Sequence, residues 1–112
     1  MRAPKLSRKL VLEAPVQVAD GAGGFSETWE AVGTLWADLK PGTGREVAAA
    51  GLSVSTVPYK ITVRAAPYNA SSRPAAGQRF VDGGRVFRVL AVTEADPQAR
   101  FLTCFAREEV AA

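Results

Sequence analysis

The sequence predicts an all-β protein, built as a small antiparallel β-barrel of six or seven strands with one long loop. Short runs of residues that favour extended structure recur along the whole chain, and turns rich in glycine and proline separate them. Amphipathic periodicity typical of a helix is not sustained over ten residues anywhere. A barrel is expected because closure removes exposed strand edges.

The first two predicted strands form a hairpin. Residues 9–13 and 16–18 have strand-forming composition, and Pro15 between them is expected to bend or end the strand. The cluster at residues 20–24 contains aspartate and three glycines, which adopt positive φ readily, so a tight turn is expected there. A second strand then follows at residues 25–32.

Gly33 is expected to break the chain before a third strand at residues 34–40. The two faces of the preceding strand are poorly sorted into polar and apolar, as in an edge strand or an interface, and Trp29 lies there. Trp36 lies among polar residues. Its ring could cap one end of the core, lie under the following loop, or contact another molecule. Both tryptophans are therefore candidates for a subunit interface.

Residues 41–56 interrupt the series of strands. A break of this length in a small β-domain is usually functional, disordered or both. Its centre, residues 45–50, has high helical propensity and is bounded by Gly44 and Gly51. A helix of two turns is too short to be stable alone in water, so it would need something to pack against.

Beyond the loop, apolar residues alternate with Lys60, Thr62 and Arg64, which is typical of a half-buried strand with one basic face. We expect Arg107, Glu108 and Glu109 near the end of the chain to be solvated. The remaining elements are a strand at residues 59–65, a surface loop at 66–77, a hairpin of strands 79–81 and 85–92 around a glycine turn, and a last strand at 100–110.

Composition and charge restrict the kind of protein. The 112 residues are 47% hydrophobic and 22% charged, as in folded proteins, and we expect one domain, residues 1–112. The net charge is +3, and a basic N-terminal arm, about residues 1–8, is expected to contact nucleic acid or an acidic partner, or to be a solvated tail. No membrane span or signal peptide is expected. Four cations precede the first acidic residue: Arg2, Lys5, Arg8 and Lys9.

The reactive side chains point away from catalysis. Histidine is absent, and the single cysteine, Cys104, lies in an apolar run where a small buried thiol is expected. The acidic residues are scattered rather than paired, and Gly42-Thr43-Gly44-Arg45 lacks the lysine and the context of a phosphate-binding P-loop. We therefore expect no catalytic residues, no cofactor and no metal.

Cations on the later strands suggest contacts with DNA or with a neighbouring subunit. The candidates are Arg64, Arg85 and Arg88, together with the four N-terminal cations. A second hypothesis is accordingly a small nucleic-acid-binding β-barrel that acts alone. Sequence-specific binding of single strands is not favoured, because the aromatic residues needed to stack bases occupy positions that are expected to be core. A solvated polar face would explain the same charges.

The order and spacing of several motifs resemble a known family. A glycine-rich hairpin leads into Glu27-Thr28-Trp29-Glu30, and the run at residues 32–41 ends at Gly44-Arg45-Glu46. Residues 59–64 and 82–89 complete the pattern. From about Leu6 to Val110, the chain resembles the phage head-tail joining family, the small head-closure or stopper proteins of tailed phages that also occur in phage-derived gene transfer particles.

The resemblance implies a barrel subunit that catalyses no reaction. It would form a ring of six or twelve copies at the particle neck after assembly in the bacterial cytoplasm. The portal-adaptor ring would lie above it, tail terminator or tail tube proteins below it, and packaged double-stranded DNA in its channel. The ring would close the head and dock the tail.

In relatives, the loop that matches residues 41–56 can project toward the channel axis as a plug. Arg45 and Glu46 are the only ionised residues of this loop, so steric closure is expected rather than electrostatic gripping of DNA. The candidate plug residues are Pro41, Gly42, Gly44, Arg45, Glu46, Val47, Ala49, Gly51, Leu52 and Ser53.

Overall fold

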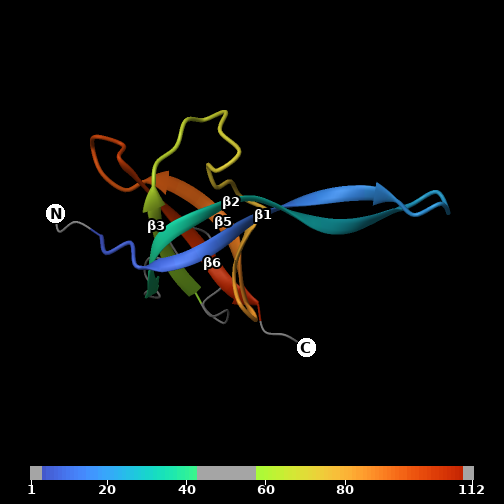
Figure 1. Ribbon diagram of the computed structural model, residues 1–112, viewed down its shortest axis with the longest axis horizontal. Helices are drawn as coiled ribbons and strands as arrows, with labels where there is room; N and C mark the ends of the chain where they lie inside the picture. The colour runs from blue at the N-terminus through green and yellow to red at the C-terminus, as the bar shows by residue number, and fades with distance from the viewer. Residues whose placement is uncertain (1–3, 43–57, 110–112) are drawn as a thin grey trace.

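Six antiparallel strands make up the fold in a computed structural model that describes residues 4–42 and 58–109 (Figure 1). They pair in the order β1-β2-β3-β6-β5-β4, and the pairing of β1 with β4 closes the sheet into a barrel. The predicted all-β fold is confirmed. The strands are β1 (Arg8–Ala19), β2 (Phe25–Pro41), β3 (Pro58–Arg64), β4 (Arg79–Asp82), β5 (Arg85–Glu94) and β6 (Phe101–Glu109).

The described residues contain no helix, and so none that is long and apolar enough to cross a membrane. The helix predicted at residues 45–50 lies outside the described residues.

Every strand contributes apolar side chains to the barrel interior. Alternation along each strand places one set of side chains inside and the other outside, which is why the period-2 pattern at residues 59–65 predicted its strand correctly. Phe80 and Phe87 are the largest fully buried side chains. The core consists of Leu10, Leu12, Ala37, Ile61, Val63, Phe80, Phe87, Val89, Leu102, Cys104 and Ala106.

The strand breaks predicted at Pro15 and Gly33 are absent. The first three predicted strands therefore form two continuous strands, β1 and β2. β1 continues through Pro15, which is tolerated because β1 has a single neighbouring strand at that point. β2 continues through Gly33, with a bulge: Leu12 faces Gly33 whereas Glu13 faces Ala31, leaving Val32 as the extra residue.

Gly33 allows close packing and does not form a turn. A Cβ atom at this position would lie 3.2 Å from the Cβ atom of Ser72, in the loop between β3 and β4. The missing side chain therefore lets that loop lie against β2.

Beyond the bulge, β1 and β2 leave the barrel as a two-stranded ribbon, here called the protruding hairpin (residues 14–31; Figure 1). β1 pairs with β4 only as far as Glu13, and β2 pairs with β3 only from Ala37 onward. The molecule is elongated in consequence, with extents of 52 × 32 × 24 Å.

The tip of the protruding hairpin is held by Asp20, as the sequence predicted for residues 20–24. The Asp20 carboxylate accepts hydrogen bonds from the backbone N–H groups of Ala22 at 2.8 Å and Gly24 at 3.1 Å. Gly21 and Gly23 adopt φ angles of 80° and 85°, which explains why glycine is needed at both positions.

Asp96 organises the loop between β5 and β6. Its carboxylate, 2% exposed, accepts hydrogen bonds from the backbone N–H groups of Arg100 at 2.8 Å and Phe101 at 3.0 Å, and from Arg100 Nε at 3.2 Å. Burial raises the pKa of Asp96, but the hydrogen bonds from Phe101 and Arg100 outweigh it, so the pKa lies below its ordinary value of 3.8.

Asp96→Asn is expected to lower the melting temperature at neutral pH. The melting temperature of the variant should also change less as the pH is lowered. A lowered folded-state pKa means that the ionised carboxylate stabilises the fold above the unfolded-state pKa. This contribution is lost as the pH falls from about 5 through the folded-state value. Melting curves of both proteins should therefore converge in acid. Glu94→Gln, which removes an exposed carboxylate nearby, is the control, and a constant difference between the curves would contradict the prediction.

Candidate interaction surfaces

Two of the ten candidate plug residues lie within the described part of the chain. Pro41 ends β2 opposite Tyr59 of β3, and the backbone N–H of Gly42 donates to the carbonyl oxygen of Pro58 at 3.2 Å. The chain therefore leaves β2 and enters β3 at the same place on the barrel. The other candidates lie outside the described residues: Gly44, Arg45, Glu46, Val47, Ala49, Gly51, Leu52 and Ser53.

The N-terminal cations differ in their exposure and in their contacts. Arg2 lies outside the described residues, while Lys5 and Lys9 are exposed. Arg8 forms an ion pair with Asp82, next to the turn between β4 and β5. This pair ties the start of β1 to the strand that closes the barrel.

Arg85 and Arg88 are paired with carboxylates of the last strand. Arg85 donates from Nε to Glu108 Oε2 at 2.7 Å and from Nη2 to Glu108 Oε1 at 3.1 Å, and Nη2 also donates to Tyr59 Oη at 3.1 Å. Arg88 Nε donates to Glu109 Oε1 at 3.0 Å. The expectation that Glu108 and Glu109 are simply solvated is therefore wrong, because antiparallel pairing of β5 with β6 brings these side chains to the arginines.

The bidentate contact shifts the pKa values of both partners in the direction that favours their charged forms. The hydrogen bond from Arg85 holds the pKa of Glu108 below its usual value, although burial opposes this shift. The same hydrogen bond raises the pKa of Arg85. The pair therefore stays ionised throughout the neutral range and compensates the charge of Arg85 within the chain.

Arg64 differs from Arg85 and Arg88 in having no carboxylate partner in the part of the chain that the structure describes. It is exposed, its guanidinium lies 5.5 Å from the centre of the Phe101 ring, and it forms no ion pair with the residues that the structure describes. It is thus available to an anionic partner.

The two tryptophans have different environments. Trp29 lies at the base of the protruding hairpin, with the guanidinium groups of Arg79 and Arg88 at 4.1 Å and 5.1 Å from its ring. Arg79 Nε in turn donates to Glu13 Oε1 at 2.7 Å. Trp36 is 55% exposed and so does not cap the core.

Trp36 borders a hollow on the barrel, formed by the N-terminal segment, β2 and the loop after β3. The hollow has a volume of about 280 Å³, and we call it the Trp36 hollow. Its apolar side chains come from the N-terminal segment and from β2, and Arg64 lies at its margin. It is lined by Leu6, Thr34, Leu35, Trp36, Arg64, Ala65, Ala66 and Ser72.

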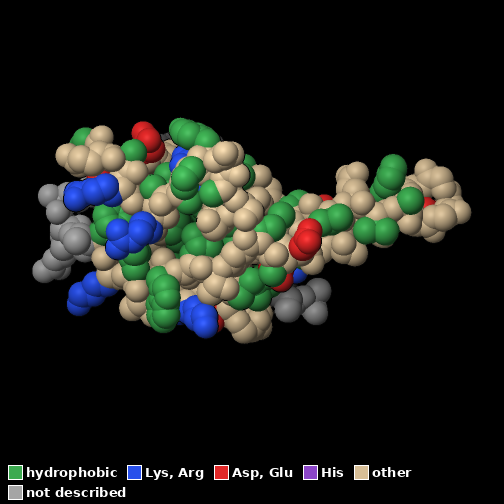
Figure 2. Space-filling view, turned by 45° about the horizontal axis from the view of Figure 1, so that its top comes forward, with side chains coloured by type: hydrophobic (Ala, Val, Ile, Leu, Met, Phe, Trp, Pro, Cys, Tyr) green, Lys and Arg blue, Asp and Glu red, His purple; other side chains and the backbone are tan. Residues whose placement is uncertain are grey.

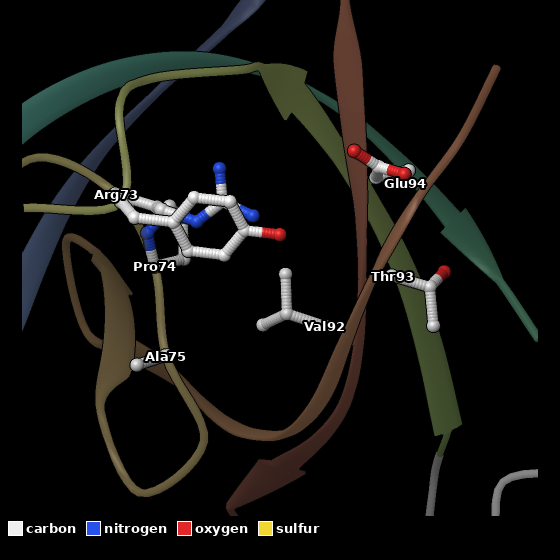
Figure 3. A pocket seen from close by; sticks show the side chains of 7 residues that line it. Arg73, Pro74, Ala75, Val92, Thr93 and Glu94 are labelled. Carbon is white, nitrogen blue, oxygen red and sulfur yellow. The ribbon is translucent and has the colours of Figure 1, made fainter. Parts of the chain in front are cut away.

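A second hollow, of about 390 Å³, lies between the loop after β3 and the end of β5 (Figure 3). The ring of Tyr68, 84% exposed, lies 3.9 Å from the guanidinium of Arg73, and Arg73 Nη1 donates to the carbonyl oxygen of Ala66 at 2.7 Å. Sequence reasoning missed this hollow, since an irregular loop has no periodic pattern that pairs its side chains. Glu94 gives it an acidic margin.

The cysteine that the sequence singled out is a core residue. Cys104 is fully buried, and burial raises the pKa of its thiol to about 12, so it remains protonated. The predicted small buried thiol is thus confirmed. In residues 4–42 and 58–109, no three His, Cys, Asp or Glu side chains gather as a metal site would require.

Comparison with known proteins identifies the family of the chain. The model of the phage head completion protein family matches residues 1–109. A chain in the virion of a native gene transfer agent particle is 47% identical, with a TM-score of 0.78, and the match covers 98% of this chain and 100% of that one. Protein SF1141 from Shigella flexneri 2a shares the fold over the full length of both chains, with 23% identity and a TM-score of 0.73. No curated protein matches the sequence. The chain belongs to the phage head completion protein family, as its resemblance to head-tail joining proteins predicted.

Proposed function

We propose that this chain is the subunit of a head-closure ring at the particle neck, located between the portal-adaptor complex and the tail. The ring retains packaged DNA and presents the surface on which the tail docks. One observation carries the proposal: a chain of a gene transfer agent virion matches 98% of this chain at 47% identity. A structural role in a phage-like particle follows from the family, and closure of the head is the further step proposed.

The arrangement of charges favours a connector over a stand-alone nucleic-acid-binding barrel. Arg85 and Arg88 form ion pairs with carboxylates of their own chain. Phosphate contacts need cations that are free to replace condensed counterions. Of the strand cations considered for DNA, Arg64 remains uncompensated among the described residues.

The plug remains a prediction from the resemblance. Its geometric support is that Pro41 and Tyr59 are paired, so the chain leaves and re-enters the barrel at one point. A connection that starts and ends together can extend from the barrel without disturbing the sheet.

Depletion of the chain from particle-producing cells tests the proposed function. We expect heads without tails that lose DNA, and we expect the full-length chain to restore tailed, DNA-filled particles. Tailed and filled particles in the absence of the chain would contradict the connector role. Deletion of residues 44–53 in the restoring chain tests the plug alone, and normal DNA retention and tail attachment with this variant would contradict it.

A further inference from the structure

The protruding hairpin extends beyond the barrel and exposes apolar side chains near its tip. Beyond the bulge each of its strands has one neighbour, and a two-stranded hairpin is marginally stable by itself in water. Near its tip, Phe25 is 69% exposed and Val18 is 46% exposed. An elongated ribbon with exposed apolar side chains at its end is suited to insertion against another protein.

The charge of the protruding hairpin has one sign. Residues 14–31 contain Asp20, Glu27 and Glu30 and no lysine or arginine. Asp20 is engaged in the turn, whereas Glu27 is exposed. Phe25 and Glu27 are two residues apart on β2, so both project from the same face of the ribbon. That face therefore presents an aromatic ring beside a carboxylate.

The Trp36 hollow, which lies on the barrel, has complementary properties. It combines apolar side chains with Arg64, which has no ion-pair partner among residues 4–42 and 58–109. The exposed Lys5 and Lys9 belong to the same end of β1. Figure 2 shows Lys and Arg side chains gathered at the end remote from the protruding hairpin and none on the hairpin itself. A volume of about 280 Å³ suits a side-chain anchor, being below the usual range of small-molecule pockets, about 300–1,000 Å³.

The two surfaces cannot meet within one chain. Phe25 and Trp36 lie on the same strand, and a rise of about 3.3 Å per residue separates them by roughly 35 Å. Contact between them thus requires a second copy. Contact between two different patches produces a head-to-tail interface, which generates a ring when the rotation between copies closes.

We propose that the protruding hairpin of each copy docks into the Trp36 hollow of the next copy, with Phe25 in the hollow and Glu27 paired with Arg64. This inference rests on the proposed function, because it supplies the contact that holds the ring together. The second hollow is the poorer receptor: Glu94 would repel Glu27, and Arg73 is engaged by Tyr68 and Ala66.

Charge reversal in the particle-producing cells tests the contact. Glu27→Arg and Arg64→Glu are each expected to lower the yield of tailed, DNA-filled particles at least about tenfold, because each places like charges together. A chain that carries both substitutions should recover most of the yield. Co-expression of the two single variants should also recover it, because copies that alternate around a ring pair each altered residue with the other.

Glu30→Arg is the matched control. It reverses a charge on the same ribbon, but Glu30 lies on the opposite face from Glu27, so near-normal yield is expected. Unchanged yield with Glu27→Arg or with Arg64→Glu would overturn the proposed contact, as would failure of both rescue combinations. Depletion of the whole chain tests the connector function separately, so the hairpin contact can fail while the function stands.

Discussion

Replacement of Phe87 by alanine is expected to lower the free energy of unfolding by about 3–5 kcal/mol. The ring is fully buried in the barrel and packs edge-on against Tyr59, with 5.1 Å between ring centres. Truncation loses this apolar contact and leaves a cavity that a closed barrel can collapse into only partly. For a domain of this size, a loss of that magnitude is a large part of the total stability.

Urea denaturation of the purified chain measures the effect. Phe87→Leu preserves most of the side-chain volume and should lower the free energy of unfolding by less than about 1.5 kcal/mol. Phe25→Ala removes an exposed ring and should leave the stability of the single chain nearly unchanged. Equal losses for Phe87→Ala and Phe25→Ala would contradict the assigned core.

Trp29→Ala is expected to detach the base of the protruding hairpin from the barrel. The free energy needed to open the hairpin should fall by about 1–3 kcal/mol. The ring lies against the guanidinium groups of Arg79 and Arg88, each held by a carboxylate on another strand. Because a two-stranded hairpin is only marginally stable, this loss should open residues 14–31 while the barrel stays folded.

Hydrogen exchange resolved along the chain separates the two regions. Backbone amides of residues 14–31 should exchange faster in Trp29→Ala, while amides of β5 and β6 keep their protection. Trp29→Phe retains an aromatic face for the arginines and should show a smaller change. A uniform loss of protection across the barrel would mean that Trp29 supports the core rather than the hairpin.

Local patterns were sufficient to predict most of the fold. Alternation at residues 59–65 predicted β3, and the glycine turns at residues 20–24 and at Gly83 predicted both hairpins. These features depend on neighbours along the chain: side chains alternate across a strand, and glycine adopts positive φ at little cost. The buried thiol of Cys104 followed from the apolar run around it, and the order of motifs was enough to indicate the family.

Contacts between distant segments could not be predicted in this way. Gly33 suggested a break, yet β2 continues through it and it packs closely against Ser72, which lies 39 residues further along the chain. Arg85 and Arg88 suggested a basic surface, yet they are compensated by Glu108 and Glu109. The sequence shows that a residue is a cation, but it does not show whether the side chain contacts solvent, DNA or a carboxylate on the neighbouring strand.

Periodicity, backbone preference and motif order are read along the chain, and they were enough to predict the all-β fold, its glycine turns and the family. The folded chain was needed to show which charges are compensated, where β1 and β2 leave the barrel as a protruding hairpin, and which residues line the Trp36 hollow. Ion pairs and hollows depend on strand register and barrel closure, which bring together residues far apart in the chain.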